Sequence, residues 1–323
     1  MAKPKALEVW HTPDYLSALK DAELTGEVSD ETKTKFGLGT PSNPIFPEMY
    51  RRPATSAGGT LLAGEMLSTP GIVHVPGGGT HPGLPARANG FCYLNDPVLG
   101  ILSLKRQGLQ RIAYVDLDAH HPDGVVHGFE RDTDVLLISV NEQNRWPRTG
   151  HLDERGAGEV WNLPVPPGLG DTDFERILDD FICQQLQAFK ADAIVLQCGA
   201  DSLTEDPQSR LALSNRSFLK AVYQIMGLTD RLMVLGGGGY NPWSVGRCWT
   251  AIWGRLNGFD LPDCLPNEAR EVLSKLSWQK SSRDVMPDQT WITTLVDEPR
   301  PGVPNSDVRS RLKSLSERAQ SWY

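Results

Sequence analysis

The sequence predicts an α/β fold in which a mainly parallel sheet is flanked by helices. Short apolar runs rich in Val, Ile and Leu alternate with longer stretches that carry apolar residues at helical spacing. Such runs are typical of strands buried on both faces, and their alternation with helices indicates parallel strands. The 323 residues fit one large domain or two average ones. Since no linker divides the chain, we expect one domain over residues 1–323.

The expected elements follow one another along the middle of the chain. Strands are expected at residues 72–75, 111–117, 135–140, 193–197 and 231–235. Helices are expected at residues 97–106, 174–189, 215–228 and 242–256, and Ser214 is the expected cap of the third. This order of elements predicts a sheet covered on its faces by the intervening helices.

Three further segments have a less regular pattern. Residues 27–53 and 141–158 are expected to be long irregular segments, and such segments in a compact domain are often functional. Residues 262–323 have few strand signals and end in an amphipathic stretch at 308–319. We therefore expect residues 262–323 to form a C-terminal helical extension packed on the main domain.

Composition excludes several classes of protein. The chain has 40 acidic and 32 basic residues, a formal charge of -8, and no Lys/Arg cluster, so it is not a general nucleic-acid coat. Its longest apolar runs are too short to cross a membrane, and residues 1–5 lack the apolar stretch of a signal peptide. Its scattered cysteines favour a reducing compartment, and we expect a cytoplasmic enzyme. These cysteines are Cys92, Cys183, Cys198, Cys248 and Cys264.

The densest polar cluster, at residues 116–123, directly follows the second expected strand. Along an extended chain Asp116, Asp118 and His120 project to one side, because strand side chains alternate. Carboxylate oxygen and imidazole nitrogen are suitable ligands for a divalent first-row metal. Sites in open α/β sheets form at the carboxyl ends of strands. The cluster therefore predicts a metal site, and an acidic helix start with surface histidines is the alternative.

Three other strand ends carry polar residues. Asp201 follows the fourth expected strand and is a candidate third ligand, which would leave one position open for water or substrate. Tyr240 follows four glycines after the fifth strand, where its hydroxyl can donate to a developing oxyanion. His81 follows three glycines after the first strand and is a candidate acid or base. Taken alone, Asp201 and His81 are more often structural residues, and Tyr240 is as often only packed under a turn.

Together the four strand ends resemble the histone deacetylase superfamily, and within it the bacterial acetoin-utilisation (AcuC-like) branch. The match runs from about His11 to the end of the chain, and its most specific stretches are residues 87–96, 114–121, 196–203 and 235–240. The resemblance implies a three-layer arginase/deacetylase-like fold. Its mainly parallel sheet has eight strands flanked by helices, and the first N-terminal strand is expected to be absent here.

The resemblance also implies roles for individual residues. Asp118, His120 and Asp201 look like the ligands of Zn²⁺, or of Fe²⁺, which the same ligand set suits. Tyr240 looks like the oxyanion donor, and Asp116 looks like the residue that orients His81.

Further residues look like walls of a substrate tunnel or like potassium ligands. The tunnel residues are Gly90, Phe91, Trp146, Gln208 and Gly238, of which Gln208 replaces a commonly more apolar residue. One structural K⁺ site is implied at Ser139 and Val140, together with backbone oxygens of Asp116, Asp118 and His120. A second is implied at Phe129, Asp132, Val135 and Trp161.

Two departures from the family pattern bear on activity. The family has two consecutive histidines where this chain has His81 and Pro82, and proline cannot transfer a proton. The second histidine usually acts as the main acid/base, with Asp123 as its partner. Aligning His81 with that second position instead would need a one-residue gap before Gly90. Loss of a general base typically costs about 10²–10⁴-fold in rate.

The second departure concerns the N-terminal end. The chain starts close to the segment that matches the family's His-x-x-x-Tyr pattern, here His11 to Tyr15. We therefore expect that the first strand, its helix and the loop that lines one tunnel edge are missing, and that either the start is shortened or that edge is open.

Three functions are compatible with these residues. The first is a zinc-dependent deacetylase that acts on an acetyl-lysine peptide or protein, or on a small acetylated amine. The second is a catalytically weakened relative that binds acylated ligands or a partner protein. Pro82 is the observation that suggests it. The third, an arginase-like ureohydrolase, fits less well because Asp123 comes three residues after His120. Neither nucleic acid nor a membrane is an expected partner.

Overall fold

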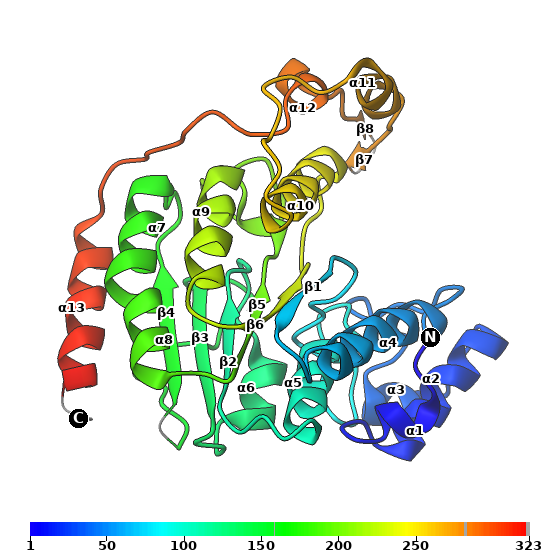
Figure 1. The fold of residues 1–323 in the computed structure, drawn as a ribbon. Coiled ribbons are helices and arrows are strands. Elements are labelled where there is room, and N and C mark those ends of the chain that lie inside the picture. The colour runs from blue at the N-terminus through cyan, green and yellow to red at the C-terminus, as the bar shows by residue number, and fades with distance from the viewer. Residues whose placement is uncertain (158, 281–282, 321–323) are drawn as a thin grey trace.

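Six parallel strands form the central sheet of the computed structural model, which describes residues 1–157, 159–280 and 283–320. The order across the sheet is β1-β6-β5-β2-β3-β4 (Figure 1). These strands are β1 (Gly71–Val75), β2 (Ile112–Asp116), β3 (Val135–Glu142), β4 (Val160–Val165), β5 (Ala193–Gln197) and β6 (Arg231–Leu235). Five of the six lie at predicted positions, so the parallel α/β prediction is confirmed.

The sheet of the described chain has six strands, whereas the resemblance implied eight with the first N-terminal strand absent. Its residues before Gly71 form the helices α1 (Pro4–Leu7), α2 (Pro13–Thr25), α3 (Asp30–Phe36) and α4 (Arg51–Met66), and no strand of the sheet. Conversely, the sequence pattern missed β4 because Pro164 interrupts it. Proline has no N–H to donate and is found mainly on edge strands, and β4 is an edge of this sheet.

Helices cover both faces of the sheet, which gives three layers (Figure 1). On one face lie α7 (Asp171–Ile177), α8 (Cys183–Phe189), α9 (Asn215–Met226), α10 (Pro242–Leu256) and α13 (Ser306–Gln320). On the other lie α4, α5 (Asp96–Arg106) and α6 (Asp123–Phe129). Alternate residues of each strand point to opposite faces; thus Val115 packs in the first core and Tyr114 in the second.

Several helix predictions need correction. The stretch predicted as one helix is interrupted by a π-helical turn, Leu178–Ile182, between α7 and α8. Ser214 precedes α9 but does not cap it, because its Oγ donates to Asp171 Oδ2 instead. The segment 27–53 is not wholly irregular, since it contains α3, which Ser29 caps by accepting the Thr32 N–H.

The C-terminal part lies against the same core. Helix α13 contributes Val308, Leu312 and Leu315 to the core on one face of the sheet. The remaining described elements are the short 3-10 helix Ala200–Ser202, α11 (Asn267–Ser274), α12 (Gln289–Thr293) and the antiparallel pair β7 (Gln279–Lys280) and β8 (Arg283–Asp284). Among the described helices, none combines the length and apolar character needed to cross a membrane.

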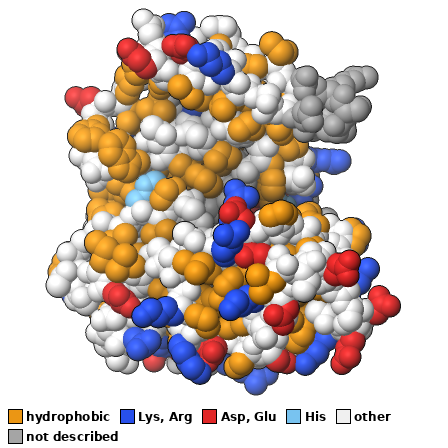
Figure 2. All heavy atoms as spheres, turned by 90° about the vertical axis from the view of Figure 1, so that its right-hand side faces the viewer, with side chains coloured by type: hydrophobic (Ala, Val, Ile, Leu, Met, Phe, Trp, Pro, Cys, Tyr) orange, Lys and Arg blue, Asp and Glu red, His pale blue; other side chains and the backbone are white. Residues whose placement is uncertain are grey.

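Strand β1 forms the other edge of the sheet and pairs only with β6. Ile72 of β1 and the α4 residues Leu62 and Met66 have exposed hydrophobic side chains. The face shown in Figure 2 has hydrophobic side chains across its middle and most of its charged side chains along its lower part.

His11 and Tyr15 each form hydrogen bonds with the segment that follows β1 and so hold the N-terminal helices against it. His11 is buried, its Nε2 accepts the Asn95 N–H at 3.0 Å, and its Nδ1 lies 3.3 Å from the Pro85 carbonyl oxygen. The Tyr15 hydroxyl donates to the Tyr93 carbonyl. Both residues are therefore structural in this chain.

This burial makes stability depend on pH. Burial lowers the pKa of His11 to about 4, whereas an unfolded histidine titrates near 6.5. Between these values the unfolded chain binds the extra proton, so the free energy of unfolding falls as the pH drops from about 6.5 towards 4. We expect His11→Gln to reduce this loss by about 2 kcal/mol between pH 7 and pH 4.5, measured by urea unfolding. An unchanged pH dependence in the variant would show that His11 is not the group responsible.

Candidate active site

A cavity of about 340 Å³ lies where the carboxyl ends of β1, β2, β5 and β6 meet. Each of the four predicted strand ends contributes to it, through His81, Asp118 with His120, Asp201 and Tyr240. The predicted tunnel residues Gly90, Phe91, Trp146, Gln208 and Gly238 also line it. Residues spread over some 160 positions of the sequence thus meet because parallel strands end at one edge of the sheet.

Three side chains in this cavity form a group that can hold a metal ion. The ligand atoms of Asp118, His120 and Asp201 all lie within 4.8 Å of one another. His120 Nδ1 is 3.0 Å from Asp118 Oδ1 and 2.9 Å from Asp201 Oδ2, and both carboxylates are buried. A tetrahedral metal ion bound by these two carboxylate oxygens and one imidazole nitrogen would keep a fourth position open, as the metal of a catalytic zinc site does.

Hydrogen bonds fix the carboxylate oxygens of Asp118 and Asp201 that face away from the possible metal position. Asp118 Oδ2 accepts hydrogen bonds from the Gly238 N–H at 2.8 Å and from Gln197 Nε2 at 2.9 Å. Asp201 Oδ1 accepts the Ala119 N–H at 3.0 Å. Asp118 Oδ1 and Asp201 Oδ2 are therefore held towards His120 Nδ1, as ligands oriented by outer-shell hydrogen bonds are.

The glycine run after β6 is required by these carboxylates. A Cβ on Gly238 would lie 2.1 Å from Asp201 Oδ2, and one on Gly237 would lie 2.2 Å from Gln197 Nε2. The same holds after β5, where a Cβ on Gly199 would lie 2.1 Å from Asp118 Oδ2. These glycines let the backbone approach the predicted metal ligands closely. The glycine run is therefore explained without assuming a phosphate-binding loop.

His81 and Asp116, which the resemblance pairs, lie in contact. His81 Nδ1 lies 2.7 Å from Asp116 Oδ2, which also accepts the Tyr114 hydroxyl at 2.5 Å. Its Nε2 is 3.7 Å from Asp118 Oδ1, so this nitrogen is directed towards the metal-ligand group. Burial alone would lower the pKa of His81, but the carboxylates of Asp116 and Asp118 raise it to about 9.

Asp123 has a different partner from the one the family pattern implies. Pro82 is buried where the second histidine is expected, and Asp123 Oδ2 instead accepts a hydrogen bond from Asn89 Nδ2 at 3.0 Å. Asn89 Nδ2 also donates to the Pro82 carbonyl at 3.1 Å. Asp123 Oδ1 accepts the Gly124 N–H, and burial raises the pKa of Asp123 to about 6. Asn89 therefore links Pro82 to Asp123.

The other nearby histidines do not replace the missing one. His121 Nδ1 lies 2.8 Å from Thr149 Oγ1 and its Nε2 lies 3.2 Å from Asn162 Oδ1, and the ring does not line the cavity. His127 packs edge-on against Trp10. Of the described histidines, His81 and His120 line the cavity, and His120 belongs to the metal-ligand group.

Aromatic side chains surround the mouth of the cavity. Phe91, Trp146 and Tyr240 are 60%, 40% and 42% exposed, although each lines the cavity. Gly90 has φ +54°, and a Cβ there would lie 2.1 Å from the Trp146 ring. Gly90 thus allows the Trp146 ring to lie against the backbone, where no larger residue fits. The Tyr240 hydroxyl is a donor available to a bound ligand.

Sequence analysis missed the residues that hold the loop carrying His81. Asp96 accepts hydrogen bonds from the Gly79 N–H and from the N–H and hydroxyl of Thr80. Asn95 Nδ2 donates to the carbonyls of His81 and Gly83, while Asn95 Oδ1 caps α5. Asn95 and Asp96 lie in the stretch 87–96 that carries the family resemblance, but taken by itself an Asn-Asp pair at a helix start is indistinguishable from ordinary capping. Thr80, Cys92 and Ser42, which line the cavity, were also missed.

The predicted potassium ligands lie in two places. Ser139 is the register partner of Asp116, on neighbouring strands β3 and β2, and Val140 follows it. Phe129, Asp132 and Val135 form the turn after α6, where the Asp132 N–H donates to the Phe129 carbonyl and the Val135 N–H to the Asp132 carbonyl. Trp161 lies on β4 opposite Ile138. Both potassium sites remain predictions.

The chain is similar in sequence to known proteins. Residues 1–256 match the family described as "Histone deacetylase domain". The chain is 31% identical to the acetoin utilization protein AcuC of Bacillus subtilis over 303 residues, 89% of the chain and 76% of the relative. It is 33% identical to histone deacetylase 8 of Xenopus laevis over 276 residues, 81% of the chain and 84% of the relative.

Solved structures agree with the sequence relatives. The structure is similar to the crystal structure of a histone deacetylase homologue from Aquifex aeolicus, with a TM-score of 0.91 and 34% sequence identity. The match covers 97% of this chain and 86% of the other. A structure of a histone deacetylase homologue complexed with SAHA matches equally well.

Proposed function

Because the chain belongs to the histone deacetylase family, we propose that it is a metal-dependent amide hydrolase that removes an acetyl group from acetyl-lysine or a small acetylated amine. The observation that carries this proposal is the convergence of Asp118, His120 and Asp201 beside His81 and Tyr240 in one cavity. The working metal would be Zn²⁺ or Fe²⁺, and K⁺ would have a structural role.

The metal, when bound by Asp118, His120 and Asp201, would polarise the amide carbonyl and activate water as the nucleophile. The other residues position the substrate and move protons. Phe91 and Trp146 would hold the alkyl chain that carries the acetamide, since both are apolar and line the mouth of the cavity. The Tyr240 hydroxyl would donate a hydrogen bond to the oxygen on which negative charge develops.

His81 would carry out the proton transfers of the reaction. Asp116 holds its Nδ1, so Nε2 is the nitrogen that can exchange a proton with the reacting groups. Without a metal, the carboxylates of Asp116 and Asp118 raise the pKa of this ring to about 9, and the protonated ring suits donation to the departing amine. A cation bound by Asp118 would offset the charge of that carboxylate and lower this pKa, so that the neutral ring could first accept a proton from water. Because Pro82 supplies no second imidazole, His81 would have to take part in both proton transfers.

A metal-dependent assay tests this proposal. Metal-free protein, prepared with a chelator, should not hydrolyse acetyl-lysine peptides or acetylpolyamines, and added Zn²⁺ or Fe²⁺ should restore turnover. Tyr240→Phe should then lower kcat by about 10²–10³-fold and change KM little, because the hydroxyl acts on the transition state. If none of these substrates is turned over with Zn²⁺ or with Fe²⁺, the proposal that the chain is a hydrolase is refuted.

Pro82 favours a second candidate function, in which the chain binds acylated ligands without efficient hydrolysis. In that case an acetyl-lysine peptide should bind to the metal-loaded protein with saturation while turnover stays at background. Calorimetry with the assayed substrates, read beside the assay, distinguishes the two functions. A hydrolase forms product from the substrate that it binds, whereas a binding protein does not.

A further inference from the structure

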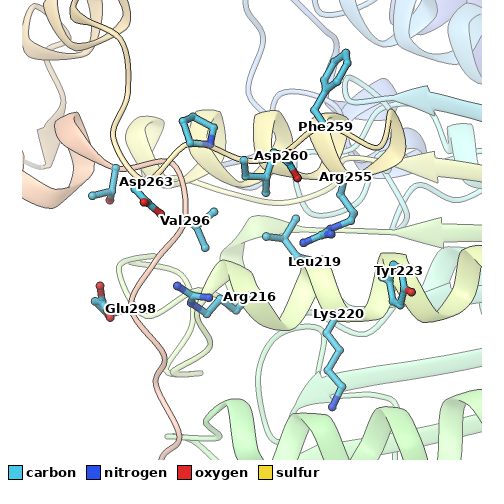
Figure 3. A pocket seen from close by; sticks show the side chains of 13 residues that line it. Arg216, Leu219, Lys220, Tyr223, Arg255, Phe259, Asp260, Asp263, Val296 and Glu298 are labelled. Atoms are coloured by element: carbon cyan, nitrogen blue, oxygen red, sulfur yellow. The ribbon is translucent and has the colours of Figure 1, made fainter.

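A second cavity, of about 660 Å³, lies away from the candidate active site (Figure 3). Helices α9 and α10 form part of its lining, and residues 259–263 and 294–298 form the rest. The family match ends at residue 256, so these two segments lie outside it. The volume is in the range of small-molecule sites, and none of its lining residues also lines the candidate active site.

One part of the lining of this cavity, here called its apolar floor, is apolar, although polar side chains make up the larger share of the lining. Leu219 belongs to the main hydrophobic core, and Leu261 and Val296 pack against that core. Tyr223 and Phe259 also line the cavity and are 67% and 53% exposed. An apolar floor bordered by two aromatic rings suits the body of a planar or aliphatic molecule.

Arg255 supplies a specific polar contact. Its Nε is buried and has no hydrogen-bond partner among the described residues, and its Cζ lies 6.0 Å from the centroid of the Tyr223 ring. In Figure 3 its guanidinium extends from α10 towards Leu219 of α9. The buried Nε is closed to a ligand, but the terminal nitrogens of the guanidinium are not buried and make no hydrogen bond among the described residues. A guanidinium pairs best with a carboxylate. The cavity therefore has an unused anion-binding group beside its apolar floor.

The neighbouring charges limit what can bind. Lys220 is already paired with Glu175 and Asp179, at 3.0 and 3.3 Å, and Figure 3 shows it directed away from Arg255. Arg216 Nε donates to the Asp297 carbonyl. Exposed carboxylates also line the cavity: Asp260, Asp263 and Glu298. The repulsion by these three groups grows with the negative charge of the ligand, so they disfavour a polyanion more strongly than a ligand with a single carboxylate.

We propose that this cavity is a binding site for a small monocarboxylate with an apolar or aromatic body, whose carboxylate pairs with Arg255. This site is independent of the proposed hydrolase activity, because it shares no residue with the candidate active site.

Calorimetry with 2-naphthoate, and with tripolyphosphate as the polyanion, tests the proposal on the full chain. We expect saturable binding of naphthoate by about 1 mM, weak or no binding of tripolyphosphate, and binding at least about tenfold weaker in Arg255→Gln. Arg52→Gln, which removes an exposed arginine of α4, is the matched control and should bind as the original chain does.

A second variant covers the case in which Arg255→Gln does not fold. Val296→Trp fills the apolar floor and leaves Arg255 in place, and it should also weaken naphthoate binding. Urea unfolding establishes that each variant is folded. The proposal is overturned if naphthoate does not bind, if folded Arg255→Gln or Val296→Trp binds it unchanged, or if tripolyphosphate binds more tightly.

Discussion

Replacing His120 with alanine is expected to remove the bound metal and to lower kcat/KM by about 10³-fold or more, about 4 kcal/mol in the barrier. His120 Nδ1 lies within 3.0 Å of oxygens of both Asp118 and Asp201, so its loss leaves two buried carboxylates facing each other. Burial and the Asp118 carboxylate already raise the pKa of Asp201 to about 7. Without the imidazole, one of the two acids should stay protonated and bind metal poorly.

The measurement is metal content by mass spectrometry together with turnover of an acetyl-lysine peptide. His151→Ala is the matched control, because His151 is an exposed histidine outside the cavity, and it should retain metal and activity. Stoichiometric metal in folded His120→Ala would contradict the assigned ligand set. Loss of metal with retained turnover would contradict the metal dependence of the reaction.

The second large effect is expected from Pro82 and Asn89 changed together. A histidine at position 82 needs Asp123 as its partner, but Asn89 Nδ2 already contacts both Asp123 Oδ2 and the carbonyl of residue 82. Pro82→His alone should therefore raise kcat only slightly. The double variant Pro82→His with Asn89→Ala should raise it on the order of 10²-fold, since a general base contributes about 10²–10⁴-fold.

Single Asn89→Ala is the control for this pair. It removes one of the two hydrogen-bond donors to the Asp123 carboxylate, so we expect a loss of about 1–2 kcal/mol in the free energy of unfolding. The gain of the double variant should exceed the product of the single effects. If Pro82→His alone gives the full gain, Asn89 does not occupy the partner position. If the double variant stays at the original rate, another group has taken over the proton transfer.

Sequence reasoning predicted the parallel α/β class correctly, and it singled out four strand-end clusters whose residues line one cavity. These clusters are local patterns: a short apolar run followed by polar residues or glycines is visible without any knowledge of contacts. The identity of Asp118, His120 and Asp201 as a possible ligand set depended only on residue type and on the rule that parallel strands end at one edge of the sheet.

The sequence alone determined the sheet class, the candidate ligands of a metal ion and the departure at Pro82. Only the tertiary structure decided that the described chain has six strands, that Asn89 binds Asp123, and that Asp96 holds the His81 loop. The pairing of Asn89 with Asp123 joins positions 34 residues apart, and an Asn before a glycine is in sequence an ordinary turn residue. The Arg255 cavity likewise depends on segments about 40 positions apart packing around an arginine that no local pattern distinguishes.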